Sequence, residues 1–147
     1  MSKSSHALLF TAAISLASSL ALASEPTKVV VKLSDGKNGH MSLTLSPATI
    51  PSGPVEFTVE NESGNTVHEF LFAKWTKADD ALPYDQKTQQ VREDEVKGLQ
   101  GIEDLRPRET VTAQFILGKG RYVVFCNEPG HYHDGMQTMF VVGGGKG

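Results

Sequence analysis

From Lys28 onward, apolar and polar residues alternate with a period of two along most of the chain. Successive side chains of a β-strand point to opposite faces, so this alternation predicts strands with one buried face. The first three strands are indicated by apolar residues at Val29, Val31 and Leu33, at Met41, Leu43 and Leu45, and at Val55, Phe57 and Val59. Four more are predicted at Thr66–Ala73, Thr110–Leu117, Arg121–Cys126 and Met136–Val142.

Turn-forming sequences separate these segments, as in Ser34-Asp35-Gly36, Pro51-Ser52-Gly53-Pro54 and Asn61-Glu62-Ser63-Gly64-Asn65. Short strands with frequent turns are typical of an antiparallel β-sandwich. We therefore expect an all-β domain.

The pattern changes in residues 74–104, which are rich in charged and amide side chains and poor in apolar ones. A structureless loop of this length is uncommon inside a compact domain. We interpret the segment as an insertion that is partly helical, with one surface helix over Gln86–Leu99. Its larger apolar residues should pack over one edge of the sandwich: Trp75, Leu82, Tyr84 and Ile102.

The N-terminus has the layout of a secretory signal peptide over residues 1–23. Lys3 and His6 precede an apolar run from Ala7 to Ala23, which ends in small residues suited to cleavage before Ser24. An uncleaved membrane anchor is the alternative, but the run is shorter than the roughly 20 apolar residues of a span. We expect export to the periplasm, no stable membrane insertion after cleavage, and one domain over residues 24–147.

The formal net charge is −3 at pH 7, and Lys and Arg form no cluster longer than a pair. Nucleic acid and anionic membranes are therefore poor candidate partners. We expect a monomer.

Cys126 is the only cysteine. This is unusual for an exported domain, because the cysteines of such domains usually form disulfide bonds in pairs. An unpaired exported thiol is either buried and incidental, a link to another chain, or a metal ligand.

The residues around Cys126 favour a metal. Four residues separate Cys126 from His131, and four more separate His131 from Met136, within one turn between two predicted strands. Two strands joined by a compact loop can aim these three side chains at a single point. Thiolate, imidazole and thioether together favour copper, and two histidines, a cysteine and a weak axial methionine form an electron-transfer site. The second histidine must come from elsewhere in the chain, and we expect His68, because it alone lies in a predicted strand bounded by a turn, in Asn65-Thr66-Val67-His68-Glu69-Phe70.

Three features resemble the cupredoxins, the type 1 (blue) copper protein family. They are the Asn-x-x-His-Glu-Phe segment, the approach Leu105-Arg106-Pro107-Arg108-Glu109-Thr110 before a strand, and Gly-x-Tyr-x-x-x-Cys-x-x-x-x-His-x-x-x-x-Met at the end. The spacing of the ligand loop is closest to the rusticyanin and sulfocyanin type. The resemblance covers nearly all of the chain after residue 23 apart from the insertion.

The resemblance implies a Greek-key β-sandwich of about seven to eight strands that holds one type 1 copper ion. His68, Cys126 and His131 would be the strong ligands and Met136 the weak axial one, with the Val67 carbonyl approaching from the opposite side. The family often has Asn after the first histidine, where it braces the cysteine loop. This chain has Glu69 there, so the bracing is expected from Asn65 or Asn127.

Each candidate has a simpler reading. His133 competes with His131, but it leaves too little chain before Met136 and is expected to face solvent. His40, beside Met41, is expected to be a surface residue rather than a second metal site. Met136 could begin the last strand as core packing, and Met139 is expected in the core.

The predicted function is an electron carrier between a redox donor and an acceptor. The alternative is a copper-handling protein that delivers or sequesters the ion, with His40, Met41 and His133 recruited to an exchangeable site. An enzyme of the multicopper type needs a further histidine cluster. With His6 in the signal and two histidines used, only His40 and His133 remain.

Overall fold

The computed structural model describes residues 24–36, 40–75 and 81–143. The predicted signal peptide, residues 1–23, lies outside the described residues, so export and cleavage stay predictions. Within the described ranges, no helix is long and apolar enough to cross a membrane.

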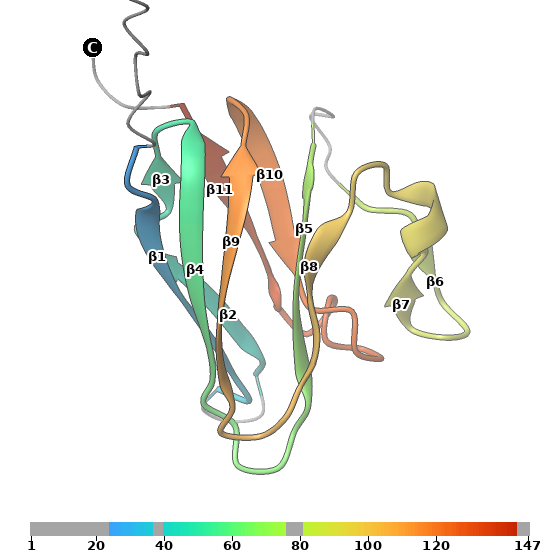
Figure 1. Cartoon of the computed structure of the whole chain (residues 1–147). Coiled ribbons are helices and arrows are strands. Elements are labelled where there is room, and N and C mark those ends of the chain that lie inside the picture. Colours follow the sequence, from blue (N-terminus) through green and yellow to red (C-terminus); the bar gives the residue numbers. More distant parts are fainter. Residues whose placement is uncertain (1–23, 37–39, 76–80, 144–147) are drawn as a thin grey trace, which may run out of the picture.

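Two sheets pack face to face (Figure 1). The first has the order β2-β1-β4-β9, and the second has the order β3-β11-β10-β5-β8. The strands of the first sheet are β1 (Thr27–Ser34), β2 (Ser42–Ser46), β4 (Gly53–Asn61) and β9 (Thr110–Leu117). Those of the second are β3 (Thr49–Ile50), β5 (His68–Lys74), β8 (Gln100–Leu105), β10 (Gly120–Phe125) and β11 (Gln137–Val142).

All seven predicted strands are present, and the all-β sandwich is confirmed. The pairing is mainly antiparallel, but β1 pairs with β4 in parallel and β11 pairs with β3 in parallel. The antiparallel β2 already occupies one edge of β1. The strand β4 therefore pairs with the other edge of β1, and it runs in the same direction as β1. The sequence pattern also missed the short β3 and the edge strand β8.

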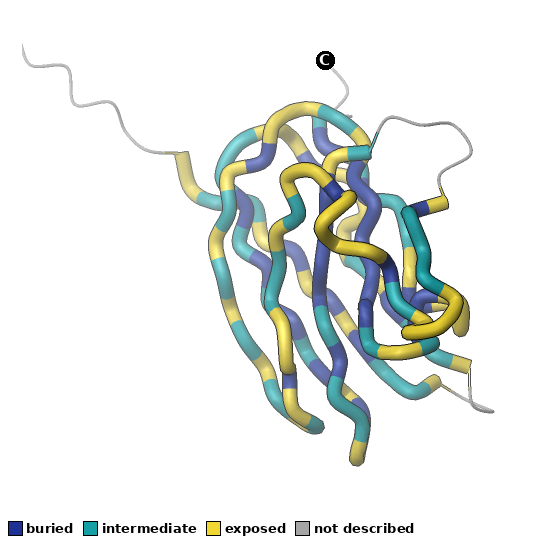
Figure 2. Tube along the Cα trace, turned by 90° about the vertical axis from the view of Figure 1, so that its right-hand side faces the viewer, coloured by how far each residue is buried: buried dark blue, intermediate teal, exposed yellow. Residues whose placement is uncertain are grey.

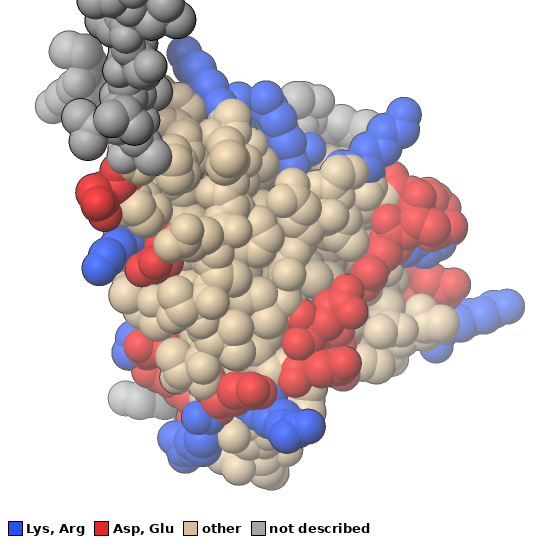
Figure 3. Space-filling model, in the orientation of Figure 1, with Lys and Arg blue, Asp and Glu red and all other residues tan. Residues whose placement is uncertain are grey.

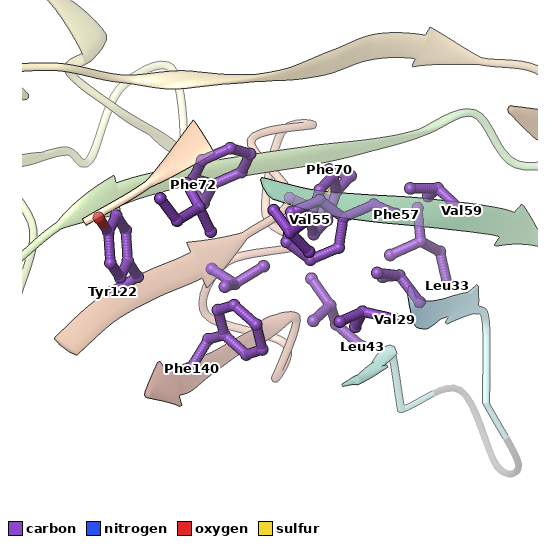
Figure 4. Packing of buried hydrophobic residues seen from close by; sticks show 14 of the residues in the cluster. Val29, Leu33, Leu43, Val55, Phe57, Val59, Phe70, Phe72, Tyr122 and Phe140 are labelled. Atoms are coloured by element: carbon purple, nitrogen blue, oxygen red, sulfur yellow. The ribbon is translucent and has the colours of Figure 1, made fainter. Parts of the chain in front are cut away.

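The core lies between the sheets, where the inward residues of the alternating strands meet (Figures 2 and 4). Phe57 on β4 is its centre: its ring centroid lies 4.9 Å from that of Phe70, 5.7 Å from those of Phe72 and Phe140, and 6.0 Å from that of Phe115. Cys126 and Met136 belong to the same buried cluster. One end of this apolar core therefore consists of residues that the sequence assigns to a metal site.

The predicted helix over Gln86–Leu99 was wrong. The insertion instead forms a small hairpin of β6 (Tyr84–Asp85) and β7 (Gln90–Val91), followed by a single 3₁₀ turn, η1 (Glu93–Glu95). Val91 and Val96, both buried, are five positions apart and would lie on different faces of an α-helix. The extended backbone lets both side chains face the sandwich.

The first part of the insertion covers a face of the second sheet, whereas its last residues form the edge strand β8. Its apolar residues join the outward side chains of β5 and β10 in a second buried cluster. That cluster comprises Leu71, Ala73, Leu82, Val91, Val96, Val123, Phe125 and Tyr132, with Trp75, Tyr84, Leu99 and Met139 partly buried against it. Ile102 packs against the main core instead. The second sheet is thus buried on both faces at its centre.

Candidate metal centre

Three of the four predicted ligands lie at the ends of strands, and the fourth lies in the loop between β10 and β11. His68 is the first residue of β5, Cys126 directly follows β10, and Met136 directly precedes β11. His131 lies in the loop of residues 126–136, called the ligand loop below. The loop is closed by two backbone hydrogen bonds: the Cys126 N–H donates to the Met136 carbonyl at 3.0 Å, and the Met136 N–H donates to the His131 carbonyl at 3.0 Å.

His68, Cys126 and His131 converge on one point, although they are far apart in the sequence. The two Nδ1 atoms lie 3.2 Å apart, and the Cys126 Sγ lies 3.5 Å from the Nδ1 of His131 and 3.9 Å from that of His68. Metal–nitrogen and metal–sulfur bonds of about 2.0–2.3 Å at trigonal angles place donor atoms about 3.5–3.7 Å apart, within the range of the observed distances. The spacing therefore fits three donors around a single ion.

A polar relay behind His68 selects which ring nitrogen is free. Its Nε2 lies 2.8 Å from the Ser63 Oγ, and the Ser63 hydroxyl donates to the Asp35 carboxylate at 3.0 Å. Because the hydroxyl proton is used on Asp35, the Ser63 oxygen accepts from Nε2–H of His68. The lone pair of Nδ1 is then left to face the donor cluster, which is how such outer partners orient metal-binding histidines.

The sequence pattern identifies Asp35 and Ser63 only as turn residues. It did not predict that they orient the His68 ring through hydrogen bonds. They lie 28 residues apart and meet because the ends of β1 and β4 are neighbours in the first sheet. No sequence pattern predicts that Asp35 and Ser63 form a hydrogen bond. Only the short spacing from Ser63 to His68 could have indicated a contact between those two residues.

His131 occupies a more open position than His68. It is 9 % exposed, whereas His68 is fully buried. Burial lowers the pKa of both imidazoles, and in His68 the neighbouring His131 lowers it further. Both rings are therefore held neutral, which is the form that binds a metal.

Cys126 is fully buried, and burial raises the pKa of its thiol to about 12, although backbone N–H groups of Glu128 and Glu69 oppose this shift. The Glu69 N–H lies 3.2 Å from the sulfur. A thiol this hard to ionise needs a strong positive charge beside it to become a thiolate. The chemistry of the site therefore fits a thiolate-binding metal ion better than a free reactive cysteine.

Met136 is also fully buried, and its backbone is hydrogen-bonded to both Cys126 and His131. It belongs to the main core cluster together with Cys126. The position suits both an axial thioether and core packing, so its part in metal binding stays a prediction.

The ligand loop is braced from two sides. On the sandwich side, the Asn127 N–H donates to the Glu69 carboxylate at 3.1 Å, so Glu69 itself reaches the cysteine loop. On the insertion side, the Asn127 side chain accepts from Val91 N–H at 2.6 Å and donates to the Val91 carbonyl at 3.0 Å and to the Glu93 carboxylate at 2.7 Å. The expectation that Asn127 braces the loop is confirmed. The exposed Asn65 makes no bond to the loop among those found in the described residues.

Acidic side chains gather beside this bracing contact, and Figure 3 shows them as a band on the side that carries β8 and the insertion. Carboxylate oxygens of Glu69, Asp104 and Glu128 lie within 4.8 Å of one another. Burial, and next the charge of Glu128, raise the pKa of Glu69 to about 7. The site therefore has a negative flank.

The competing residues lie away from the donor cluster. His133 is exposed, as expected, and its ring packs edge-on against Tyr84 with centroids 4.1 Å apart. His40 is exposed, which agrees with a surface residue. Met139 is only partly buried and packs against the second cluster, not the main core.

A scan against models of known protein families finds no match, and a search of curated proteins finds none either. Solved structures do match. Rusticyanin from Thiobacillus ferrooxidans is 19% identical, with a TM-score of 0.58, over 80% of this chain and 79% of that one. Auracyanin B is 17% identical, with a TM-score of 0.56, over 82% and 92%. Auracyanin from Roseiflexus castenholzii is 24% identical, with a TM-score of 0.51, over 82% and 98%.

These similarities extend over most of each chain and agree with the two-sheet arrangement. The chain has a rusticyanin-like cupredoxin fold.

Proposed function

We propose that this protein binds one type 1 copper ion through His68, Cys126, His131 and Met136 and carries single electrons between two redox proteins. The observation that carries the proposal is the convergence of two neutral imidazole nitrogens and one buried thiol on a single point. Copper bound there would supply reversible one-electron chemistry. With the predicted signal peptide as support, we propose that the protein carries out this activity in the periplasm.

The residues around the site suit repeated electron transfer because hydrogen bonds from outside the donor set hold its shape. Ser63 and Asp35 lock the His68 ring, the Glu69 N–H contacts the cysteine sulfur, and two backbone bonds fix the ligand loop. When the ligands keep their positions in both oxidation states of the metal, the reorganisation energy of electron transfer is small. His131, the less buried histidine, is the natural point of electron entry.

The burial of the donors favours a carrier over a protein that releases copper. His40 and His133 are exposed and do not belong to the donor cluster found in the described residues.

Replacing Cys126 with Ser tests the proposal. The intense visible absorption of the Cu(II)-loaded protein should disappear, because that absorption arises from charge transfer between thiolate sulfur and Cu(II). Absorption and far-ultraviolet circular dichroism spectra of both proteins, each after Cu(II) addition, provide the measurement. His133→Ala is the matched control and should stay blue. A Cys126→Ser protein as blue as the wild type would remove the thiol from the site.

The axial role of Met136 is tested by two variants with opposite expected shifts. Met136→Leu removes a weak donor and adds apolar surface, so the reduction potential should rise, whereas Met136→Gln offers a harder oxygen donor and should lower it. Voltammetry on the copper-loaded proteins measures both. Unchanged potentials in the two variants would show that Met136 only packs in the core.

A further inference from the structure

A small polar groove opens where the insertion meets the ligand loop. It has a volume of about 250 Å³ and is lined by Tyr84, Gln86, Gln89, Gly130, His133 and Asp134. The space holds a group considerably larger than one water, which occupies about 30 Å³ in the liquid. Gly130 directly precedes His131, so the groove adjoins the proposed point of electron entry.

Two oxygens face the same point above Gly130. A methyl group placed on Gly130 would lie 3.5 Å from the Gln89 Oε1 and 3.8 Å from the Asp134 Oδ2. Across the residues that the structure describes, neither side chain takes part in a hydrogen bond or ion pair. The φ of 88° at Gly130 favours glycine, and the missing side chain keeps the space between the two oxygens open.

Two of the lining residues, Tyr84 and His133, are aromatic, and backbone hydrogen bonds hold the lining in place. The ring of Tyr84 packs edge-on against that of His133, with centroids 4.1 Å apart. The Gly130 N–H donates to the Gln89 carbonyl at 2.8 Å, and the Asp134 N–H donates to the Gly130 carbonyl at 3.0 Å. The hairpin and the ligand loop therefore form one surface rather than two loops that happen to meet.

We propose that this groove binds a guanidinium group, presented by an arginine side chain of the redox partner. A carboxylate and an amide oxygen offer two acceptors to the planar fork of donors on arginine, and two aromatic rings in the lining favour contact with a guanidinium. The negative charge of Asp134 excludes anions. Hard divalent cations require several carboxylate ligands, and the groove lining provides one.

The electron-transfer role of the groove rests on the proposed function, whereas guanidinium binding does not. The two parts are therefore tested separately, first on the copper-free full chain and then on the copper-loaded protein.

Guanidinium binding is tested by titrating the ¹⁵N-labelled, copper-free protein with L-argininamide and following backbone amide shifts. L-citrullinamide is the control ligand, because it has a similar shape and lacks the side-chain charge. Shifts should be confined to Gly130, His133, Asp134 and Gln89, and the neutral ligand should not produce them. Equal shifts with both ligands, or no shifts at millimolar concentrations, would overturn the proposal.

Asp134→Asn removes the charge with almost no change of shape and should abolish these shifts. Gln89→Lys places a cation in the groove and should also block argininamide. Asp94→Asn, an exposed acid on the 3₁₀ turn, is the matched control and should bind like the wild type. Retained binding in both groove variants would contradict the assignment.

The docking role is tested by the rate at which hexaammineruthenium(II), a cationic one-electron donor, reduces the copper-loaded protein. At low ionic strength, the rate constant for Asp134→Asn should be about threefold lower than that for Asp94→Asn. The reason is that the Asp134 charge adjoins His131, whereas Asp94 lies on the 3₁₀ turn. Equal slowing by the two variants would overturn the docking role. Failure to load copper would instead contradict the proposed function and leave the binding result intact.

Discussion

The sandwich and the insertion obtain their structure in different ways. In the sandwich, alternating apolar residues define each strand, and the inward side chains meet around Phe57. The insertion, residues 74–104, has few apolar residues and no regular period. Its short hairpin is held by the outer face of the second sheet and by Asn127 in the ligand loop. A segment with weak local signals can thus be well placed when another part of the chain supplies its partners.

The largest expected effect comes from the centre of the sandwich. Phe57→Ala should lower the free energy of unfolding by about 3–5 kcal/mol, because it leaves a cavity among four aromatic rings. Urea denaturation of the copper-free protein measures the loss. Ile116→Ala is the control: Ile116 is 83 % exposed on the same sheet and should change stability by less than about 0.5 kcal/mol. Similar losses in both variants would show that the core is not centred on Phe57.

An intermediate effect is expected where the insertion meets the ligand loop. Asn127→Ala removes three side-chain hydrogen bonds and leaves the buried backbone groups of Val91 without those partners. The cost should be about 1–3 kcal/mol. Hydrogen exchange should quicken at the Val91 amide first, while the amides of β4 stay protected.

Asn65→Ala serves as the control for this variant, since Asn65 is exposed. If exchange quickens equally in β4 and at Val91, the insertion and the sandwich unfold as one unit. The contrast between the two regions would then be wrong.

The smallest expected effect concerns the sandwich side of the same loop. The pKa of Glu69 is raised from 4.5 to about 7, first by burial and then by Glu128. Between these pH values the folded chain keeps a proton that the unfolded chain has released. The stability of the copper-free protein should therefore fall as pH rises through this window.

Glu69→Gln imitates the protonated acid and should remove this part of the pH dependence. It can still accept the hydrogen bond from the Asn127 N–H. Urea midpoints at pH 5 and pH 8 provide the measurement, with the exposed Glu103→Gln as the control. A variant at Glu69 that loses as much stability as the wild type between these pH values would contradict the assigned proton.

Much of the fold follows from local patterns. The period of two locates the seven main strands because burial of one sheet face requires alternate apolar residues. The spacing of Cys126, His131 and Met136 likewise places three chemically distinct side chains in one turn between two strands. The distant His68 was chosen because it lies in a predicted strand bounded by a turn, and the structure brings its ring to the thiol.

Only the tertiary structure decided the rest. Val91 and Val96 carry no local preference strong enough to exclude a helix, and their extended backbone results from burial against the second sheet. The relay from His68 through Ser63 to Asp35, and the reach of Glu69 to Asn127, join residues from separate strands and loops. Sequence alone determines which strands can form and which ligands are available, because those depend on neighbours along the chain. The bracing of the ligands depends on neighbours in space, which exist only once the two sheets have packed.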